Sequence, residues 1–167
     1  MIILGIDPAI RTTGYGVVSV SGNDISIVDC GTIRNSAKMA HSECVRRIYG
    51  GISELVNAYH PDAAAVESPF VGRNSATAII LGMARGALLA ALSNAGVPAY
   101  SYAPSAAKQA AAGRGSATKE QVATILASEL GISVADIDLD CTDALALAIC
   151  HAQCAAHPEF GKVGKMM

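Results

Sequence analysis

The sequence has no tryptophan, only two phenylalanines and no excess of positive charge, because 12 basic residues stand against 14 acidic ones. It also lacks an apolar run of the roughly 20 residues that span a bilayer without interruption by charge. The N-terminal residues enter an apolar segment directly, without the basic stretch and small-residue cleavage site of an export signal. We therefore expect a cytoplasmic protein with no membrane partner.

The length and the cysteines both favour one self-sufficient domain. A chain of 167 residues can bury a full core but leaves little room for a second one. We assign residues 1–157 to a single domain and residues 158–167 to a flexible tail. The five cysteines are odd in number and scattered, which is atypical of a disulfide framework, so we expect reduced thiols that mostly pack in the core.

The hydrophobic pattern predicts strands first and then an alternation of helices and strands. Segments rich in Ile and Val, separated by turn residues, predict three antiparallel strands at residues 2–7, 14–20 and 25–33. The remaining expected elements are a helix over 40–59, a strand over 63–67, a helix from the cap Asn74 to about Gly96, a strand over 98–102, and helices over 104–112, from the cap Ser116 to Gly131, and from about Asp140. The helix after Asn74 is so apolar that we expect it to be buried nearly all round. This order predicts an α/β sheet with helices on its faces.

Four carboxylates stand at the ends of these elements. Asp7 and Glu67 each close an apolar strand, and Asp140 and Asp143 lie three residues apart near the start of the last helix, on one side of it. Each acid also has an ordinary interpretation: a turn at Asp7-Pro8, a charge at a strand end, or a helix cap. Capping explains one acid of the helical pair but not a second acid on the face that must meet the sheet.

If the four acids converge, they need cations. Two like charges about 4 Å apart repel by roughly 4 kcal/mol at an effective dielectric near 20. Mg²⁺, with Mn²⁺ as a substitute, prefers such oxygen ligands, and two ions per site would provide a nucleophilic water and stabilise the departing oxygen of a phosphodiester. A net charge of −2 argues against a nucleic-acid partner, but two bound divalent ions would more than offset it.

Several separated motifs occur together in the sequence. They are Leu4-Gly-Ile-Asp7-Pro8, Thr13-Gly-Tyr-Gly16, Val66-Glu67, Leu81-Gly-Met-Ala-Arg-Gly86, Gly115-Ser-Ala-Thr-Lys119 and Asp140-Cys-Thr-Asp143-Ala-Leu-Ala146. In this order, from Ile3 to about His151, the chain resembles the RuvC family of bacterial Holliday-junction resolvases. The resemblance implies a ribonuclease H-like fold, with a mixed five-stranded sheet and helices on both faces. It also implies a homodimer that nicks four-way junction DNA symmetrically in recombination and repair, alongside branch-migration motor proteins.

The resemblance assigns roles to particular residues. Asp7, Glu67, Asp140 and Asp143 fall on the four metal-binding, catalytic acids, and Lys108 and Lys119 fall on lysines that handle substrate. Phe70 matches an aromatic residue near the junction centre, where stacking on a base would contribute roughly 1–3 kcal/mol. Packing of Phe70 beneath its own loop is the alternative.

Further cations are candidates for phosphate contact. Lys108, Arg114 and Lys119 surround a glycine-containing turn before a predicted helix, where amides and cations can approach phosphates together. A solvated basic loop is the alternative. Arg73 is expected to touch the DNA backbone, whereas Arg85, inside an apolar helix, is expected to pair with an internal carboxylate.

The sequence departs from the family pattern at Ala9, where glycine usually follows Asp-Pro, and Asp138 competes with Asp140 as a ligand. Two other functions stay open. One is a ribonuclease H-like nuclease that acts on RNA–DNA hybrids or structured RNA. The other is a junction-binding protein without catalysis. For a homodimer, the small-residue helix over 74–95 is the expected interface.

Overall fold

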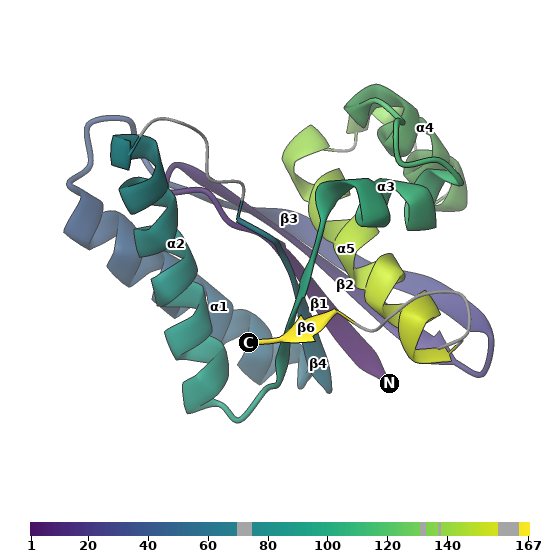
Figure 1. The fold of residues 1–167 in the computed structure, drawn as a ribbon, viewed down its shortest axis with the longest axis horizontal. Helices are drawn as coiled ribbons and strands as arrows, with labels where there is room; N and C mark the ends of the chain where they lie inside the picture. The colour runs from purple at the N-terminus through teal and green to yellow at the C-terminus, as the bar shows by residue number, and fades with distance from the viewer. Residues whose placement is uncertain (70–74, 131–132, 137, 157–163) are drawn as a thin grey trace.

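The centre of the molecule is a six-stranded mixed sheet (Figure 1). The computed structural model describes residues 1–69, 75–130, 133–136, 138–156 and 164–167. The strands are β1 (Ile2–Asp7), β2 (Thr12–Ser21), β3 (Asp24–Arg34), β4 (Ala63–Glu67), β5 (Ala99–Tyr102) and β6 (Lys165–Met166), in the order β3-β2-β1-β4-β5-β6. β1, β2 and β3 are antiparallel, β1, β4 and β5 are parallel, and β6 is antiparallel to β5.

The sixth strand corrects the expectation of five. It comes from the segment that we expected to be a flexible tail, of which residues 164–167 are described. The amide of Met167 donates to the carbonyl of Ala99 at 2.9 Å, which continues the pairing with β5. A two-residue strand carries no recognisable local pattern, because its conformation depends on the neighbouring strand to which it is hydrogen-bonded.

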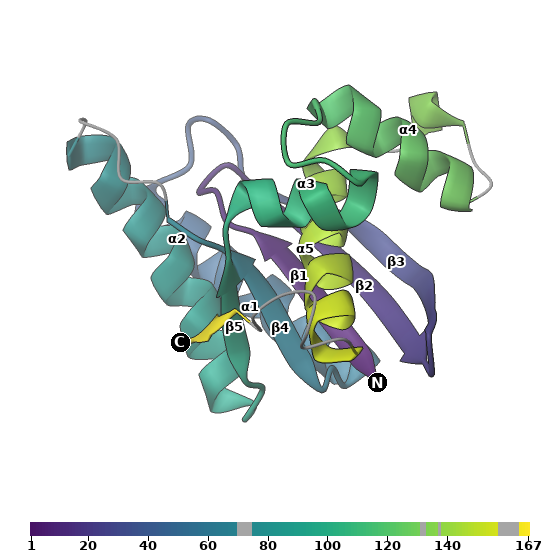
Figure 2. The same ribbon diagram turned by 45° about the vertical axis from the view of Figure 1, so that its right-hand side comes forward.

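Helices cover both faces of the sheet (Figures 1 and 2). They are α1 (His41–Tyr59), α2 (Ser75–Asn94), α3 (Pro104–Ala112), α4 (Lys119–Leu130) and α5 (Leu139–Ala156), with a 3₁₀ turn at Val134–Asp136. Alternate residues of a strand point to opposite faces. Leu4 and Ile6 accordingly pack in one core with α1 and α2, whereas Ile3 packs in a second core with α3, α4 and α5.

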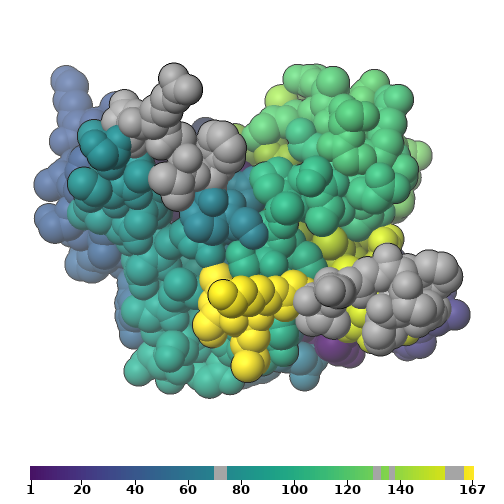
Figure 3. Space-filling view, viewed as in Figure 1, coloured from purple at the N-terminus to yellow at the C-terminus, as the bar shows by residue number. Residues whose placement is uncertain are grey.

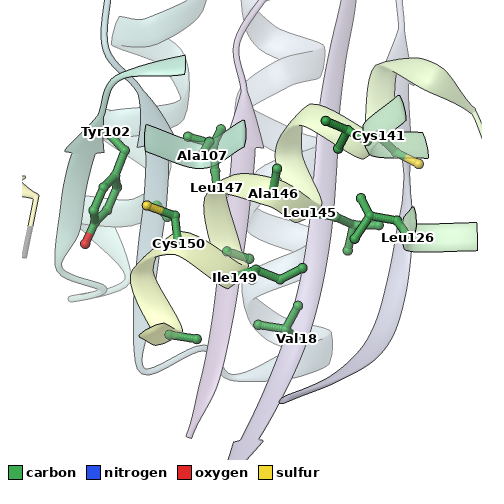
Figure 4. Close-up of a cluster of buried hydrophobic side chains, with 14 of the residues drawn as sticks. Val18, Tyr102, Ala107, Leu126, Cys141, Leu145, Ala146, Leu147, Ile149 and Cys150 are labelled. Carbon is green, nitrogen blue, oxygen red and sulfur yellow. The ribbon is translucent and has the colours of Figure 1, made fainter. Parts of the chain in front are cut away.

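Helix α5 lies directly on glycines of the sheet. A Cβ atom added at Gly5 would be 1.9 Å from the carbonyl oxygen of Ala144, and one added at Gly14 would be 2.0 Å from that of Asp140. Only glycine therefore allows this approach. Around this contact, side chains of α5 pack with others from β2, α3 and α4 (Figure 4); the labelled ones include Leu145, Ala146, Leu147, Val18, Ala107 and Leu126.

Two predictions about helices are wrong. Helix α2 is not buried nearly all round: one side packs on the sheet and α1, through Leu88 and Leu92 among others, while Ile79 is 66% exposed. The cap of α4 is Thr118 rather than Ser116, because the Thr118 hydroxyl accepts from the amide of Gln121 at 3.3 Å and the Gln121 side chain accepts from the amide of Thr118 at 3.1 Å. This reciprocal pair is a capping box.

Helix α2 also bears on the membrane expectation. Among the described residues, it is the one helix long and apolar enough to cross a bilayer by length and composition. Helices packed inside proteins pass the same test, and α2 packs along one side against the sheet.

The cysteines match the expectation of free core thiols. All five are free. Cys44, Cys141 and Cys150 are buried, and Cys30 and Cys154 are partly buried against the core. No disulfide contributes to the fold of the described residues.

Candidate active site

Strand geometry brings Asp7 and Glu67 together. β1 and β4 are parallel, with Ile6 opposite Val66, so their carboxyl ends meet at one edge of the sheet. Asp7 is two residues beyond Gly5, and Gly5 faces α5. Glu67 is two residues beyond Ala65, which packs in the same core as α5. Because side chains alternate along a strand, both carboxylates point to the side on which α5 begins.

The start of α5 separates a capping acid from the candidate ligands. The amide of Asp140 donates to the Asp138 carboxylate at 3.1 Å, and Arg34 forms an ion pair with the same side chain. Burial alone would raise the pKa of Asp138, but these hydrogen bonds outweigh it and hold the pKa below its ordinary value. Asp138 is therefore the N-cap of α5. Asp140 and Asp143 follow it on the helix.

One cavity of about 180 Å³ collects most of the predicted site. It lies where the ends of β1 and β4 meet α3, α4 and α5. Its lining consists of Asp7, Glu67, Asp143, Lys108, Lys119, Pro104, Ala107, Ala146 and Leu147. Asp140 is not part of the lining, but its charge contributes to a raised pKa of Asp7.

The acids in the cavity repel one another, and one lysine offsets part of their negative charge. The Lys119 Nζ lies 2.5 Å from Asp143 Oδ2, and this contact raises the pKa of Lys119. Burial and then the charge of Asp143 raise the pKa of Asp7. Burial, the charge of Asp7 and a shared hydrogen bond with Asp7 raise the pKa of Glu67 to about 7. The ionisation of Glu67 is thereby moved into the neutral pH range.

The donor set fits a divalent cation. Three carboxyl groups line a confined pocket together, and oxygen donors are the ligands that Mg²⁺ prefers. As they stand, no three His, Cys, Asp or Glu side chains among the described residues form a ready metal-binding group. In the cavity, Lys119 contacts Asp143 Oδ2, and a hydrogen bond joins the side chains of Glu67 and Asp7. A metal ion that used Asp143 Oδ2 as a ligand would compete with Lys119 for this oxygen.

The other predicted residues are distributed as follows. Lys108 lines the cavity with Lys119, whereas Arg114 is exposed in the turn between α3 and α4 and does not line it. Phe70 and Arg73 lie outside the described residues.

Arg85 has a different partner from the one expected. In the described part of the chain its guanidinium forms no ion pair with a carboxylate and donates to the main-chain carbonyl of Glu67. An apolar helix with a single cation indicated an internal partner, but not that the partner would be a carbonyl group.

Ala9 is compatible with the loop beside Asp7. Among the described residues, His60 is the one non-glycine residue with a positive φ, so Ala9 does not need the conformational freedom of glycine. Its carbonyl accepts a hydrogen bond from the Thr13 hydroxyl at 2.8 Å. The departure from the family pattern therefore leaves the loop in an ordinary conformation.

Comparison with known sequences gives one consistent result. Residues 3–151 match the family model described as crossover junction endodeoxyribonuclease RuvC. The RuvC of Chlorobium phaeovibrioides is 46% identical over 151 residues, which cover 90% of this chain and 80% of that protein. The RuvC of Chloroflexus aggregans is 43% identical over 91% of this chain and 93% of its own length.

Solved structures agree with the sequence comparison. The structure of T. thermophilus RuvC in complex with a Holliday junction substrate has a TM-score of 0.88 and 37% identity, covering 100% of this chain and 99% of that one. A yeast mitochondrial Holliday junction resolvase has a TM-score of 0.64 at 13% identity, covering 95% of this chain and 83% of that one. The second likeness concerns the fold alone. The ribonuclease H-like fold predicted from the sequence is confirmed, with six strands instead of five.

Proposed function

The chain belongs to the RuvC family of crossover junction endodeoxyribonucleases, and on that basis we propose that it resolves Holliday junctions by hydrolysing phosphodiester bonds in paired, symmetric nicks. The observation that carries the proposal is the convergence of Asp7, Glu67 and Asp143, from three separate segments, on one cavity with Lys108 and Lys119. Family membership favours junction DNA over an RNA–DNA hybrid, and intact acids favour a nuclease over a binding protein.

In this proposal the acids hold divalent cations. Family membership makes the nuclease metal-dependent; we propose two Mg²⁺ ions per subunit, with Mn²⁺ as a substitute, held by Asp7, Glu67, Asp140 and Asp143. When bound, such ions supply Lewis-acid activation of water and stabilise the departing oxygen. Asp140 stands one helical turn before Asp143 on the same side of α5 and completes the set.

The lysines of the cavity would receive the phosphate. Lys119 can exchange Asp143 for a phosphate oxygen without leaving its wall of the cavity, and Lys108 adds a second positive charge beside it. In the space-filling view, the green surface of α3 and α4 stands apart from the teal surface of α2 (Figure 3). We propose that junction DNA approaches the face of the molecule on which these two surfaces stand. Arg114, Phe70 and Arg73 would be further contacts to the DNA.

A homodimer is part of the proposal because paired nicks need two sites related by symmetry. Helices α1 and α2 border an apolar groove of about 530 Å³, lined among others by Val45, Tyr49, Met83 and Ala87. Ile79 lies exposed on the same helix as Met83. A second copy of the chain that covered this surface would bury it, and α2 is the helix expected at the interface from the sequence.

The cellular process, the protein partners and the location are proposed from family membership alone. We propose that the protein acts in homologous recombination and DNA repair, together with the branch-migration motor proteins of that pathway. A cytoplasmic location belongs to the same proposal, because cellular DNA is the substrate.

One assay tests the proposed activity. Purified protein is incubated with a mobile four-way junction, a linear duplex and an RNA–DNA hybrid, each with and without Mg²⁺. Asp7→Asn removes one acid of the cavity, and Asp138→Asn is the matched control, because Asp138 caps α5 and does not line the cavity.

We expect paired, religatable nicks in the junction only, dependent on Mg²⁺, abolished by Asp7→Asn and retained by Asp138→Asn. Cutting of the hybrid with the junction spared would replace this function by the hybrid nuclease. Tight junction binding without cutting under any metal condition would replace it by the architectural role.

A further inference from the structure

Arg85 joins helix α2 to the peptide group of Glu67. Its side chain is partly buried, Nη1 donates to the main-chain carbonyl of Glu67, and Nη2 lies 2.9 Å from Met167 Sδ. Burial lowers the pKa of the guanidinium, and the negative charge of Glu67 opposes that shift. The partly buried guanidinium therefore contacts a backbone group next to the cavity.

The Glu67 carbonyl is a group that the sheet leaves without a donor. The amide of Ser68 donates to Tyr102 in β5, so even-numbered residues here turn their backbone groups toward β5 and Glu67 turns its own toward β1. The pairing of β1 with β4 ends at Ile6 and Val66. The next residue of β1 in position to donate would be Pro8, which has no N–H. Arg85 supplies the missing donor.

We infer that Arg85 is a positioning residue for the reaction: by holding the carbonyl of Glu67, it sets the direction in which the Glu67 carboxylate enters the cavity. The peptide plane after Glu67 and its side chain share one Cα atom, so a rotation of the plane moves the carboxylate. Arg85 acts through Glu67 and not on the substrate. The inference rests on the proposed function, since it takes Glu67 as a catalytic acid.

If Arg85 had a purely structural role, its replacement would have different effects. Arg85 also contacts Met167, which follows β6, so its loss could simply loosen the edge of the sheet. That loss would lower stability without a specific effect on Glu67. Met167→Ala removes only this second contact and is expected to leave both metal binding and the cleavage rate unchanged.

The test compares Arg85→Met, which keeps length but removes the donors, with Arg85→Lys, which restores a cationic donor. Lys38→Met is the matched control, because Lys38 is an exposed cation that lines neither the cavity nor the apolar groove between α1 and α2. Three quantities are measured: the NMR shift of the Ser68 amide, Mn²⁺ binding without DNA by electron paramagnetic resonance, and single-turnover cleavage of a junction with Mg²⁺. Arg85→Gln replaces Arg85→Met if the latter does not fold.

We expect Arg85→Met to move the Ser68 amide shift and to weaken Mn²⁺ binding or lower the cleavage rate by about 10–100-fold, with junction affinity unchanged. Arg85→Lys should recover a large part of the loss, and Lys38→Met should match the wild type. Unchanged Mn²⁺ binding and rate in Arg85→Met, or a loss that Arg85→Lys does not restore, would overturn the inference. If the wild-type protein leaves junctions uncut, the proposed function fails, while the Ser68 shift and the Mn²⁺ affinity still decide the role of Arg85.

Discussion

Lys119, the first residue of α4, and Asp143, near the start of α5, form an ion pair with Nζ 2.5 Å from Oδ2 at the wall of the cavity that also holds Asp7 and Glu67. The pair ties two helices together and gives one acid of the cluster a protein cation as its partner. A metal ion or a phosphate that enters the cavity must compete for the same charges. The state of this pair therefore controls how much negative charge the cavity offers.

Replacement of Lys119 by Met should impair catalysis and shift its pH dependence. Lys119 lowers the pKa of both Asp7 and Glu67, so its loss should move the acid limb of the pH–rate profile to higher pH. The rate at the optimum should fall by roughly 10²-fold, as for removal of other charge-stabilising donors. Lys119→Arg should keep the position of the limb. Lys38→Met changes an exposed lysine that does not line the cavity, and an equal shift in that variant would refute the assignment.

Glu67→Gln should stabilise the protein in the absence of divalent metal at alkaline pH. Its pKa is raised from the ordinary 4.5 to about 7, so the folded state resists ionisation and loses stability as the pH rises through that interval. At pH 8 the variant should gain about 1 kcal/mol after allowance for solvent screening, and at pH 4.5 it should gain nothing. Urea unfolding in EDTA measures both values. Equal stabilities at pH 8 would mean that Glu67 ionises freely.

Mg²⁺ should stabilise the folded protein more at pH 8 than at pH 6, because Glu67 must lose its proton before it can serve as a ligand. Saturation at about 100 times the dissociation constant would contribute about 2.7 kcal/mol. Thermal unfolding with increasing Mg²⁺ gives the size of the effect. Asp7→Asn should reduce it and Asp138→Asn should not; a pH-independent effect, or one equal in all three proteins, would place the metal elsewhere.

Gly5→Ala should displace α5 and with it Asp143. The new Cβ would lie 1.9 Å from the Ala144 carbonyl oxygen and 2.9 Å from the Ala148 nitrogen, and backbone atoms cannot rotate away. We expect a loss of about 3 kcal/mol or more in the free energy of unfolding, with cleavage lost in the remaining folded protein. Gly50→Ala in α1 is the control, since nothing lies within 4 Å of its added Cβ, and it should gain up to about 1 kcal/mol. Wild-type stability in Gly5→Ala would contradict the described contact.

Ile79→Glu or Met83→Glu should convert a dimer into a monomer. Both residues lie on α2, where Ile79 is 66% exposed and Met83 borders the apolar groove. A charge there would oppose burial against a second copy of the chain. Sedimentation velocity measures the mass, and a junction plasmid distinguishes single from paired nicks. Val28→Glu, at a 48% exposed position on β3, should remain dimeric; a wild type that sediments as a monomer would remove this part of the proposal.

Local signals in the sequence determined much of the framework. Helix α3 was predicted with its observed bounds because Pro104 suits the first turn and Gly113 ends the helix at φ 71°. Asp7 and Glu67 could be recognised as candidates because each closes an apolar strand, and Asp140 and Asp143 because their spacing places them on one side of a helix. The family motifs then assigned all four a role as metal ligands. Thr118 and Gln121 also have the spacing of a capping box, so the sequence contains a signal for the observed start of α4 in addition to Ser116.

The tertiary structure alone decided which residues meet. It made Asp138 the cap of α5, left one side of α2 exposed, added β6 to the sheet, and placed Lys119 on Asp143 and Arg85 on the Glu67 carbonyl. Propensity and hydrophobic period act between residues a few positions apart. Each of these contacts instead depends on strand register and on how separate segments pack, which no local pattern of side chains encodes.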